Sequence, residues 1–292
     1  MTDLLRLERL AAPLFVVLWS TGFIGARLGL PHIEPMTFLA IRFALVVGVL
    51  WVWMRLSDAR PLTWAQARDA ALIGVLMHSI YLGGVFIAID LGLEAGVAAL
   101  IVGLQPVLTA FLAGQVLGDK LRGAQWLGMA LGFGGVALVV ARKLGEGIGD
   151  WRGVGFCAAG LLAICLASIL QKTRAGDHPL RAAAMVQFAA AAVTSALAAL
   201  IFETGSIRWT GDLVFAMAWL VLVLSVGAVS LLLILIRRGA AAEVASLFFL
   251  VPASTALIAW ALFGEVMGPV ELAGIAVAAF GVLLVNRPKP AP

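Results

Sequence analysis

Charged residues are scarce in this chain, and their scarcity limits the class of protein. Asp, Glu, Lys and Arg make up 12% of its 292 residues, whereas hydrophobic residues make up 63% and the mean hydropathy is +1.08. A water-soluble domain carries about 25% charged residues. So few polar groups cannot cover a globule of this length, and the alternative solvent is lipid. The composition predicts an all-α polytopic membrane protein.

Metal-binding and disulfide patterns are also missing. Cys157 and Cys165 lie in one apolar segment, separated by about 12 Å of helical rise, which is too far for a disulfide between them. We interpret both as buried core residues. The histidines His32, His78 and His178 lie on different segments, without an HExxH or CxxC pattern. We therefore expect no metal site and no cofactor.

Catalytic motifs are missing as well. Ser, Asp and His do not cluster in a recognised pattern, and the chain lacks a Walker GxxxxGK[ST] motif or a soluble segment large enough to hold a nucleotide. We expect neither an intramembrane enzyme nor an ATP-driven pump. The net charge of +4 is modest and is not gathered in a patch, so nucleic acid is not an expected partner.

The chain instead contains long runs of apolar residues. Ten of them have about the 17–25 residues needed to cross the hydrocarbon core of a bilayer. Arg6 and Arg9 precede the first run as in a signal peptide, but no clear A-x-A cleavage site follows, so we expect a retained helix. The expected membrane-spanning segments are 11–29, 35–54, 69–89, 95–117, 124–141, 152–171, 182–202, 213–236, 241–263 and 270–286.

The distribution of Lys and Arg predicts how these segments are oriented. If the N-terminus is cytoplasmic, 14 of these residues fall on the inner side and five on the outer side, with Arg42 inside the second segment. Such a bias is typical of the positive-inside rule. We therefore expect ten spans with both termini in the cytoplasm.

The chain repeats itself at an offset of 146 residues. Without a gap, 95–141 and 241–287 share 14 identical residues in 47 positions, and Asp119 meets Glu265. The identical pairs include Leu104/Leu250, Pro106/Pro252, Thr109/Thr255, Gly118/Gly264, Gly128/Gly274 and Gly135/Gly281. We expect an internal duplication, with one five-helix unit at 1–147 and another at 148–292.

An odd number of spans in each unit inverts the second unit with respect to the first. The two five-helix repeats are then related by a pseudo-twofold axis in the membrane plane. Secondary transporters use this arrangement, because exchanging the conformations of the two halves turns an inward-open cavity outward. The repeat predicts a carrier that works by alternating access.

The first copy also carries a family resemblance. The stretch "GLEAGVAALIVGLQPVLTAFLAGQVLGDKLRGAQWLGMALGFGGVALVV" (92–140) resembles the repeat unit of the drug/metabolite transporter superfamily, in particular its EamA-type ten-helix members. The second copy, 238–285, keeps the proline, the Gly-acid pair and the later glycines. The stretches "WSTGFIGARLGL" and "MTFLAIRF" are similar to the YddG-type aromatic amino-acid exporters. The resemblance implies export of small metabolites, with amino acids favoured, across the inner (cytoplasmic) membrane.

Polar residues inside spans are costly and are therefore the candidate substrate-binding residues. In "LMHSIYLGG" of the third segment, His78 and Tyr81 lie three residues apart on one helix face. Tyr81 is the one tyrosine of the chain. We expect both to line the cavity; the alternatives are an interhelical hydrogen bond for Tyr81 and a partner within the bundle for His78.

Gln105 is a candidate because of the proline that follows it. Pro106 frees a backbone carbonyl near Val102, and unpaired backbone groups are tolerated in a membrane only near a cavity or a partner. The equivalent of Gln105 is Val251, so the two copies differ chemically. We expect Gln105 to bind substrate and Pro106 and Pro252 to act as gating kinks; plain packing kinks are the alternative.

Four further polar or aromatic residues complete the candidate binding set. Ser168 and Gln171 lie toward the cytoplasmic end of the sixth segment, and Ser246 lies in the ninth. Trp19 in the first segment is placed to stack on an aromatic ligand, with a plain packing role as the alternative.

Small residues recur one turn apart in the fifth and tenth segments. Gly128 and Gly132 in one, and Gly274 and Ala278 in the other, let helices approach closely. We interpret these faces as packing within the bundle or as the surface of a homodimer.

The sequence offers little for ion coupling. The ionisable residues deep in spans are Arg42, His78 and, near a helix end, Asp90, and no carboxylate lies near the centre of a span. Asp119 and Glu265 lie at helix ends, where we expect caps or loop anchors. We predict transport of a small-molecule substrate down its own gradient in the lipid bilayer.

Several alternatives stay open. Proton-coupled antiport through His78 is the alternative mechanism. A drug or nucleotide-sugar carrier of the same superfamily is the alternative substrate class. A channel or a structural membrane protein is the alternative outside the carriers.

Overall fold

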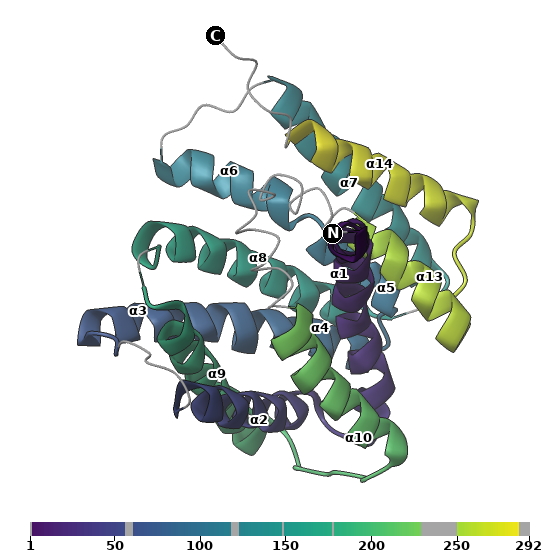
Figure 1. Cartoon of the computed structure of the whole chain (residues 1–292). Helices are drawn as coiled ribbons and strands as arrows, with labels where there is room; N and C mark the ends of the chain where they lie inside the picture. Colours follow the sequence, from purple (N-terminus) through teal and green to yellow (C-terminus); the bar gives the residue numbers. More distant parts are fainter. Residues whose placement is uncertain are drawn as a thin grey trace.

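The computed structural model describes residues 2–55, 61–117, 123–147, 149–176, 178–228 and 250–285, which are almost entirely helical. The helices pack against one another with the loops at their ends (Figure 1). Within these ranges, β pairing is limited to one isolated antiparallel bridge between Ile33 and Ile207, which lie in two loops. The all-α fold predicted from the composition is confirmed.

Each of the ten expected spans contains a helix. Seven described helical stretches are long and apolar enough to cross a membrane, and three shorter apolar helices lie in the remaining spans. The end of the eighth expected span and the start of the ninth lie outside the described residues. The elements are α1 (Thr2–Gly29), η1 (Leu30–His32), α2 (Pro35–Arg55), α3 (Trp64–Gly74), η2 (Val75–Ile80), α4 (Tyr81–Asp90), α5 (Ala95–Val102), α6 (Gln105–Leu117), α7 (Gly123–Gly145), α8 (Trp151–Arg174), α9 (Leu180–Phe202), α10 (Gly211–Ala218), η3 (Trp219–Ala228), α13 (Val251–Phe263) and α14 (Pro269–Val285).

Local sequence signals fix several helix ends. Thr63 and Gln66 form a capping box at the start of α3, and the Asp150 carboxylate accepts the Gly153 N–H at 2.7 Å at the start of α8. These side chains satisfy backbone donors that a helix start leaves free. Gly264 has φ +70° and ends α13, in a conformation that favours glycine.

The fourth span is broken at its proline, as the sequence suggests. α5 ends at Val102, a turn follows at Gly103–Leu104, and Pro106 is the second residue of α6. Pro252 is likewise the second residue of α13. Proline suits a first helical turn, because the N–H that it lacks has no intrahelical acceptor there. The two proline-containing spans touch: a Cβ built on Gly103 would lie 2.9 Å from Pro252 Cγ.

Two π-helical segments interrupt the third and eighth spans. η2 lies between α3 and α4, and η3 continues α10. Shifting η2 by 146 residues places it inside η3, so the widened turns fall at equivalent positions of the two halves. The Ser225 hydroxyl in η3 donates to the Leu220 carbonyl, five residues earlier, at 2.9 Å. π-helical turns are rare and are frequent at functional sites.

The glycine faces of α7 and α14 pack against each other within the chain. A Cβ on Gly128 would lie 2.5 Å from the Gly281 carbonyl oxygen, and a Cβ on Gly135 would lie 2.5 Å from that of Gly274. The contact is reciprocal, because Gly274 and Gly281 are the repeat equivalents of Gly128 and Gly135. These glycines are therefore used inside the bundle, the first of the two interpretations above. A homodimer through these helices stays a prediction and would have to use their outward faces.

Large apolar side chains cover the outside of the bundle. Leu200 and Phe202 of α9 are each 81% exposed, and Leu257 and Trp260 of α13 are 67% and 60% exposed. Soluble monomers rarely leave such surface uncovered. In a membrane protein, lipid covers it.

Candidate functional site

Aromatic rings from three spans meet around His78. The His78 ring, in η2, stacks on Phe188 of α9 with centroids 4.2 Å apart and planes 14° apart. Phe43 of α2 lies 5.9 Å from each of these two rings. Phe43 is fully buried, whereas His78 and Phe188 are partly exposed. The structure therefore places His78 in a cluster of aromatic rings contributed by three spans.

Tyr81 and Arg42 adjoin this cluster. Tyr81 is the first residue of α4 and lies three residues after His78, on a partly exposed face. Its hydroxyl makes no hydrogen bond with the described residues. Arg42 of α2 lies near enough to interact electrostatically with both His78 and Tyr81. The buried Arg42 guanidinium also lies 5.9 Å from the Phe43 ring centroid.

Amide side chains connect this cluster to α8. Gln187 of α9 donates from Nε2 to Gln171 Oε1 at 3.0 Å, and the Gln187 side chain also reaches His78. Gln171 was predicted as a binding residue, and the structure brings it within one intervening residue of His78. The close approach of α3 and α9 depends on Gly74, because an added Cβ would overlap the Gln187 carbonyl.

Gln105 and Ser168 form a second polar pair. Gln105 Nε2 donates to Ser168 Oγ at 3.1 Å, and this hydroxyl donates to the Ile164 carbonyl at 2.8 Å. The pair joins α6 to α8 where the fourth span is broken. Cys165, which was expected to be a core residue, is buried beside them, with its thiol 3.6 Å from the Gln105 carbonyl.

Two predicted residues stand apart from these pairs. The Trp19 ring lies 5.2 Å from Phe15 in α1, a helix that packs against η3. That neighbour agrees with the packing alternative, and the structure does not place Trp19 in the His78 ring cluster. Ser246 lies outside the described residues, as does Asp119.

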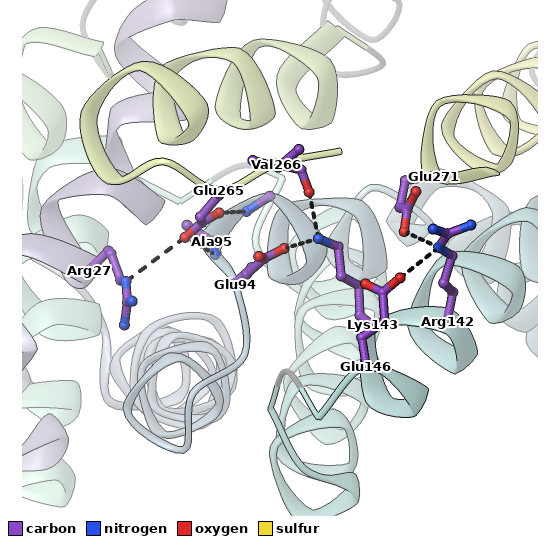
Figure 2. A network of polar contacts seen from close by, with 10 residues as sticks. Arg27, Glu94, Ala95, Arg142, Lys143, Glu146, Glu265, Val266 and Glu271 are labelled. Atoms are coloured by element: carbon purple, nitrogen blue, oxygen red, sulfur yellow. Dashed lines mark hydrogen bonds and ion pairs between the residues drawn. The ribbon is translucent and has the colours of Figure 1, made fainter. Parts of the chain in front are cut away.

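One end of the bundle is joined by a polar network, which we call the end network (Figure 2). It comprises Arg27, Glu94, Arg142, Lys143, Glu146, Glu265 and Glu271, with the backbone of Ala95, Gly96 and Val266. These residues lie at the end of α1, the start of α5 and the end of α7. The others lie in the loop between α13 and α14 and in the first turn of α14. Each half of the chain contributes, so the network connects the halves.

Glu265 and Lys143 are the buried centre of the end network. The Glu265 carboxylate accepts from the N–H groups of Ala95 and Gly96 at 3.2 and 3.4 Å, which caps α5. Lys143 Nζ lies 3.0 Å from Glu94 Oε2 and donates to the Val266 carbonyl at 2.7 Å. Burial raises the pKa of Glu265 from its ordinary value, against the lowering effect of the two N–H donors. Glu265 was expected to be a cap or loop anchor at the end of its own helix, and in the structure it caps the start of α5.

Arg142 extends the end network to α14. Its Nε lies 2.9 Å from Glu271 Oε1 and 3.0 Å from Glu146 Oε1. Glu271 is only 1% exposed. Arg142 and Lys143 are two of the five basic residues expected on the outer side, and no role was predicted for Glu94 or Glu271. The sequence did contain a signal, because Glu94 and Glu271 are acidic residues at the starts of two apolar helices, α5 and α14.

A second set of contacts at this end joins the loop before α2 to the loop after α9. The Glu203 carboxylate accepts from the Met36 and Thr37 N–H groups at 2.6 and 2.7 Å, and Glu34 accepts from the Thr204 N–H at 3.1 Å. The pKa of Glu34 is lowered chiefly by the Thr204 N–H donor. Arg208 donates to the Pro31 carbonyl beside these contacts. These contacts therefore join the two halves of the chain at this end of the bundle.

An apolar hollow of about 430 Å³ lies between α13 and α14, with Val266 of the end network at its edge. Leu257, Trp260 and Leu272, which line it, expose 67%, 60% and 59% of their surface. None of the candidate binding residues lines it. We interpret it as a lipid-facing gap, because its walls continue the apolar exterior of the bundle.

A bundle of membrane-length apolar helices with polar and aromatic side chains gathered between them defines a multi-pass membrane protein. The EamA-like transporter family model matches residues 8–141 and 151–287, and the chain belongs to this family. It is accordingly a transporter and not an enzyme.

Individual relatives share between 25% and 28% of their residues with this chain over the aligned regions. The chain is 25% identical over 279 residues to an uncharacterized inner membrane transporter, YedA, of Escherichia coli K12, covering 94% of this chain and 88% of the relative. It is 27% identical over 297 residues to a probable terminal-alkyne amino-acid exporter of Streptantibioticus cattleyicolor, covering 95% and 92%. A probable amino-acid metabolite efflux pump of Escherichia coli K12 is 28% identical over 145 residues, 48% of this chain and 44% of the pump. A crystal structure with 20% identity aligns over 94% of both chains with a TM-score of 0.65, which shows the shared fold.

Proposed function

We propose that this transporter exports amino acids, including aromatic ones, from the cytoplasm by alternating access. The observation that carries the proposal is the cluster of His78, Tyr81, Phe43 and Phe188, which lies between spans of both halves, together with the end network that closes one end of the bundle. Stacked rings suit an aromatic side chain, and amide and hydroxyl groups suit polar ammonium and carboxylate ends. The printed names of two relatives point to amino-acid export as well.

The internal symmetry supports two inverted five-helix units, at 1–147 and 148–292. The glycine contact between α7 and α14 is reciprocal under the repeat, and the π-helical segments fall at equivalent positions. α2 packs on α9, and α5 packs on α13, so equivalent spans also pair across the halves. A pseudo-twofold axis between the units accounts for all of these pairings.

In this conformation, we propose, the end network closes the outer side. The positive-inside bias predicts that both termini are cytoplasmic, and with that orientation the loops of the end network face outward. Export requires this network to open while the opposite end closes. Pro106 lies where the fourth span breaks, and Pro252 lies in the first turn of α13 in the equivalent span, which touches the break at Gly103. We propose these two prolines as the gating kinks.

Among the candidate binding residues, we assign His78, Tyr81 and Gln171 to the substrate site around the His78 ring. Gln105 and Ser168 are bonded to each other here, and we propose that substrate binding exchanges this bond for one to the substrate. Trp19 and Ser246 stay candidates from the sequence alone.

Reconstitution tests the function. Purified protein in liposomes loaded with unlabelled phenylalanine, without a pH or sodium gradient, is expected to accumulate labelled phenylalanine transiently by counterflow, with saturation and with competition by other aromatic amino acids. Protein-free liposomes are the control. Flux without counterflow would indicate a channel, flux that needs an ion gradient would indicate coupling, and counterflow only of drug-like cations or nucleotide sugars would replace the substrate class.

A further inference from the structure

Arg42 is a charged residue held inside a membrane-spanning helix. It lies seven residues into α2, about 10 Å from the start of that helix along its axis. Its side chain is buried, with 4% of the residue exposed. A charge at this depth is costly, and such residues usually pair with an opposite charge or serve a substrate pathway.

No counter-charge accompanies Arg42 in the described part of the chain. None of the ion pairs found there includes its guanidinium, and its Nε–H is buried without an acceptor. Its one hydrogen bond to a described residue is from Nη2 to the neutral Ser225 hydroxyl at 3.2 Å. A buried, unfilled donor next to an uncompensated positive charge is a site for an anion.

The surroundings of Arg42 limit the size and kind of that anion. Phe43, His78 and Phe188 form the aromatic cluster beside it, and Tyr81 lies close by. One guanidinium with apolar rings around it matches a single carboxylate attached to an aromatic group. A nucleotide sugar carries several negative charges, and the cluster contains one arginine.

Arg42 also connects the two halves. It belongs to α2 of the first half, and Ser225 belongs to η3 of the second. His78 lies in η2 and Ser225 lies in η3, and both segments are π-helical. The Arg42 guanidinium therefore lies near both π-helical segments.

We propose that Arg42 binds the carboxylate of the transported amino acid. This proposal rests on the proposed function and adds the recognition element to it. The free Nε–H and the remaining guanidinium N–H groups donate to the carboxylate, and the side chain of the substrate lies against the rings of Phe43, His78 and Phe188. The protein thereby selects substrates with a free carboxylate.

Phenylalanine and phenylalaninamide form the test pair, because the amide removes only the negative charge. We expect wild-type protein to show phenylalanine counterflow that phenylalaninamide competes with at least 10-fold more weakly. In Arg42→Gln, the half-saturation constant for phenylalanine should rise roughly 10- to 100-fold and the preference over the amide should disappear. Arg42→Lys should keep part of the preference, and Arg181→Gln, at the exposed start of α9, is the matched control.

A binding measurement separates this proposal from the transport function. Phenylacetate, but not phenylacetamide, should raise the thermal unfolding temperature of detergent-solubilised wild type and Arg42→Lys but not of Arg42→Gln. If wild type transports phenylalanine and Arg42→Gln keeps the same half-saturation constant and preference, the Arg42 proposal is wrong and the function stands. If phenylacetate stabilises in an Arg42-dependent way but no amino acid is transported, the anion site stands and the function is wrong. If neither is observed, both are wrong.

Discussion

At the scale of single residues, Gly74 sets how closely α3 and α9 can approach beside His78. An added Cβ would overlap the Gln187 backbone carbonyl, which cannot move without shifting α9. Gly48 of α2 is the matched position, because nothing lies within 4 Å of its added Cβ. The contrast separates the effect of a close backbone contact from the general helix preference of alanine.

We therefore expect Gly74→Ala to lower stability by about 1–3 kcal/mol, as overpacking does, and to weaken phenylalanine binding by displacing Gln187 from His78. Gly48→Ala should leave stability unchanged or raise it by about 0.5–1 kcal/mol. Thermal unfolding in detergent and counterflow measure the two effects. Equal behaviour of the two variants would show that α9 relaxes freely at this contact.

Residue types were easier to predict than residue partners. His78, Tyr81, Gln105, Ser168 and Gln171 stand out as polar residues within apolar runs, and the sequence suffices to select them. Their partners lie 63 residues apart in the Gln105–Ser168 pair and 16 apart in the Gln171–Gln187 pair. Helical periodicity does not specify which faces of distant helices meet, so these pairings required the structure.

At the scale of elements, the break between α5 and α6 is a built-in bend of the fourth span. In Pro106→Ala, an N–H is restored that can donate to the Val102 carbonyl, which favours a continuous helix. We expect this variant to slow counterflow at least threefold while changing the unfolding temperature little. Pro252→Ala is its symmetric partner and should act in the same direction. Unchanged rates in both would leave the prolines as packing kinks.

The end network carries a pH dependence whose sign follows from Glu265. Burial raises its pKa in the closed form, and opening would return it toward the ordinary value of 4.5. A carboxyl with the higher pKa in the closed form holds its proton more tightly there. Lowering the pH on the network side through the range above 4.5 therefore favours closure, by up to roughly tenfold for each unit of difference between the two pKa values.

We expect transport that requires opening of this end to slow as the pH falls through that range, and Glu265→Gln to remove most of the pH dependence. Glu146→Gln is the control, since Glu146 lies in the same network with an exposed side chain. The initial rate of counterflow at fixed internal pH is the measurement. A pH response in Glu265→Gln equal to that of wild type would assign it to another group.

At the scale of the whole molecule, the sequence repeat and the apolar runs predicted ten helical segments at about the right positions. The positions of the apolar runs determine this much, because lipid requires long apolar helices. The end network was not predicted, because Glu94, Lys143 and Glu271 look like ordinary charges at the ends of spans until the structure brings those ends together. The orientation of the termini stays a prediction, since the contacts of the helices are the same for either orientation.

The reciprocal glycine contact of α7 and α14 has a consequence for motion. When two inverted units exchange their shapes, a contact between Gly128 and Gly281 is replaced by its mate between Gly274 and Gly135, and both already exist together. The exchange converts each of these two contacts into the other, so the packing of α7 on α14 stays the same. We expect the contact between α7 and α14 to stay fixed during transport, while the other helices of each unit rotate relative to it.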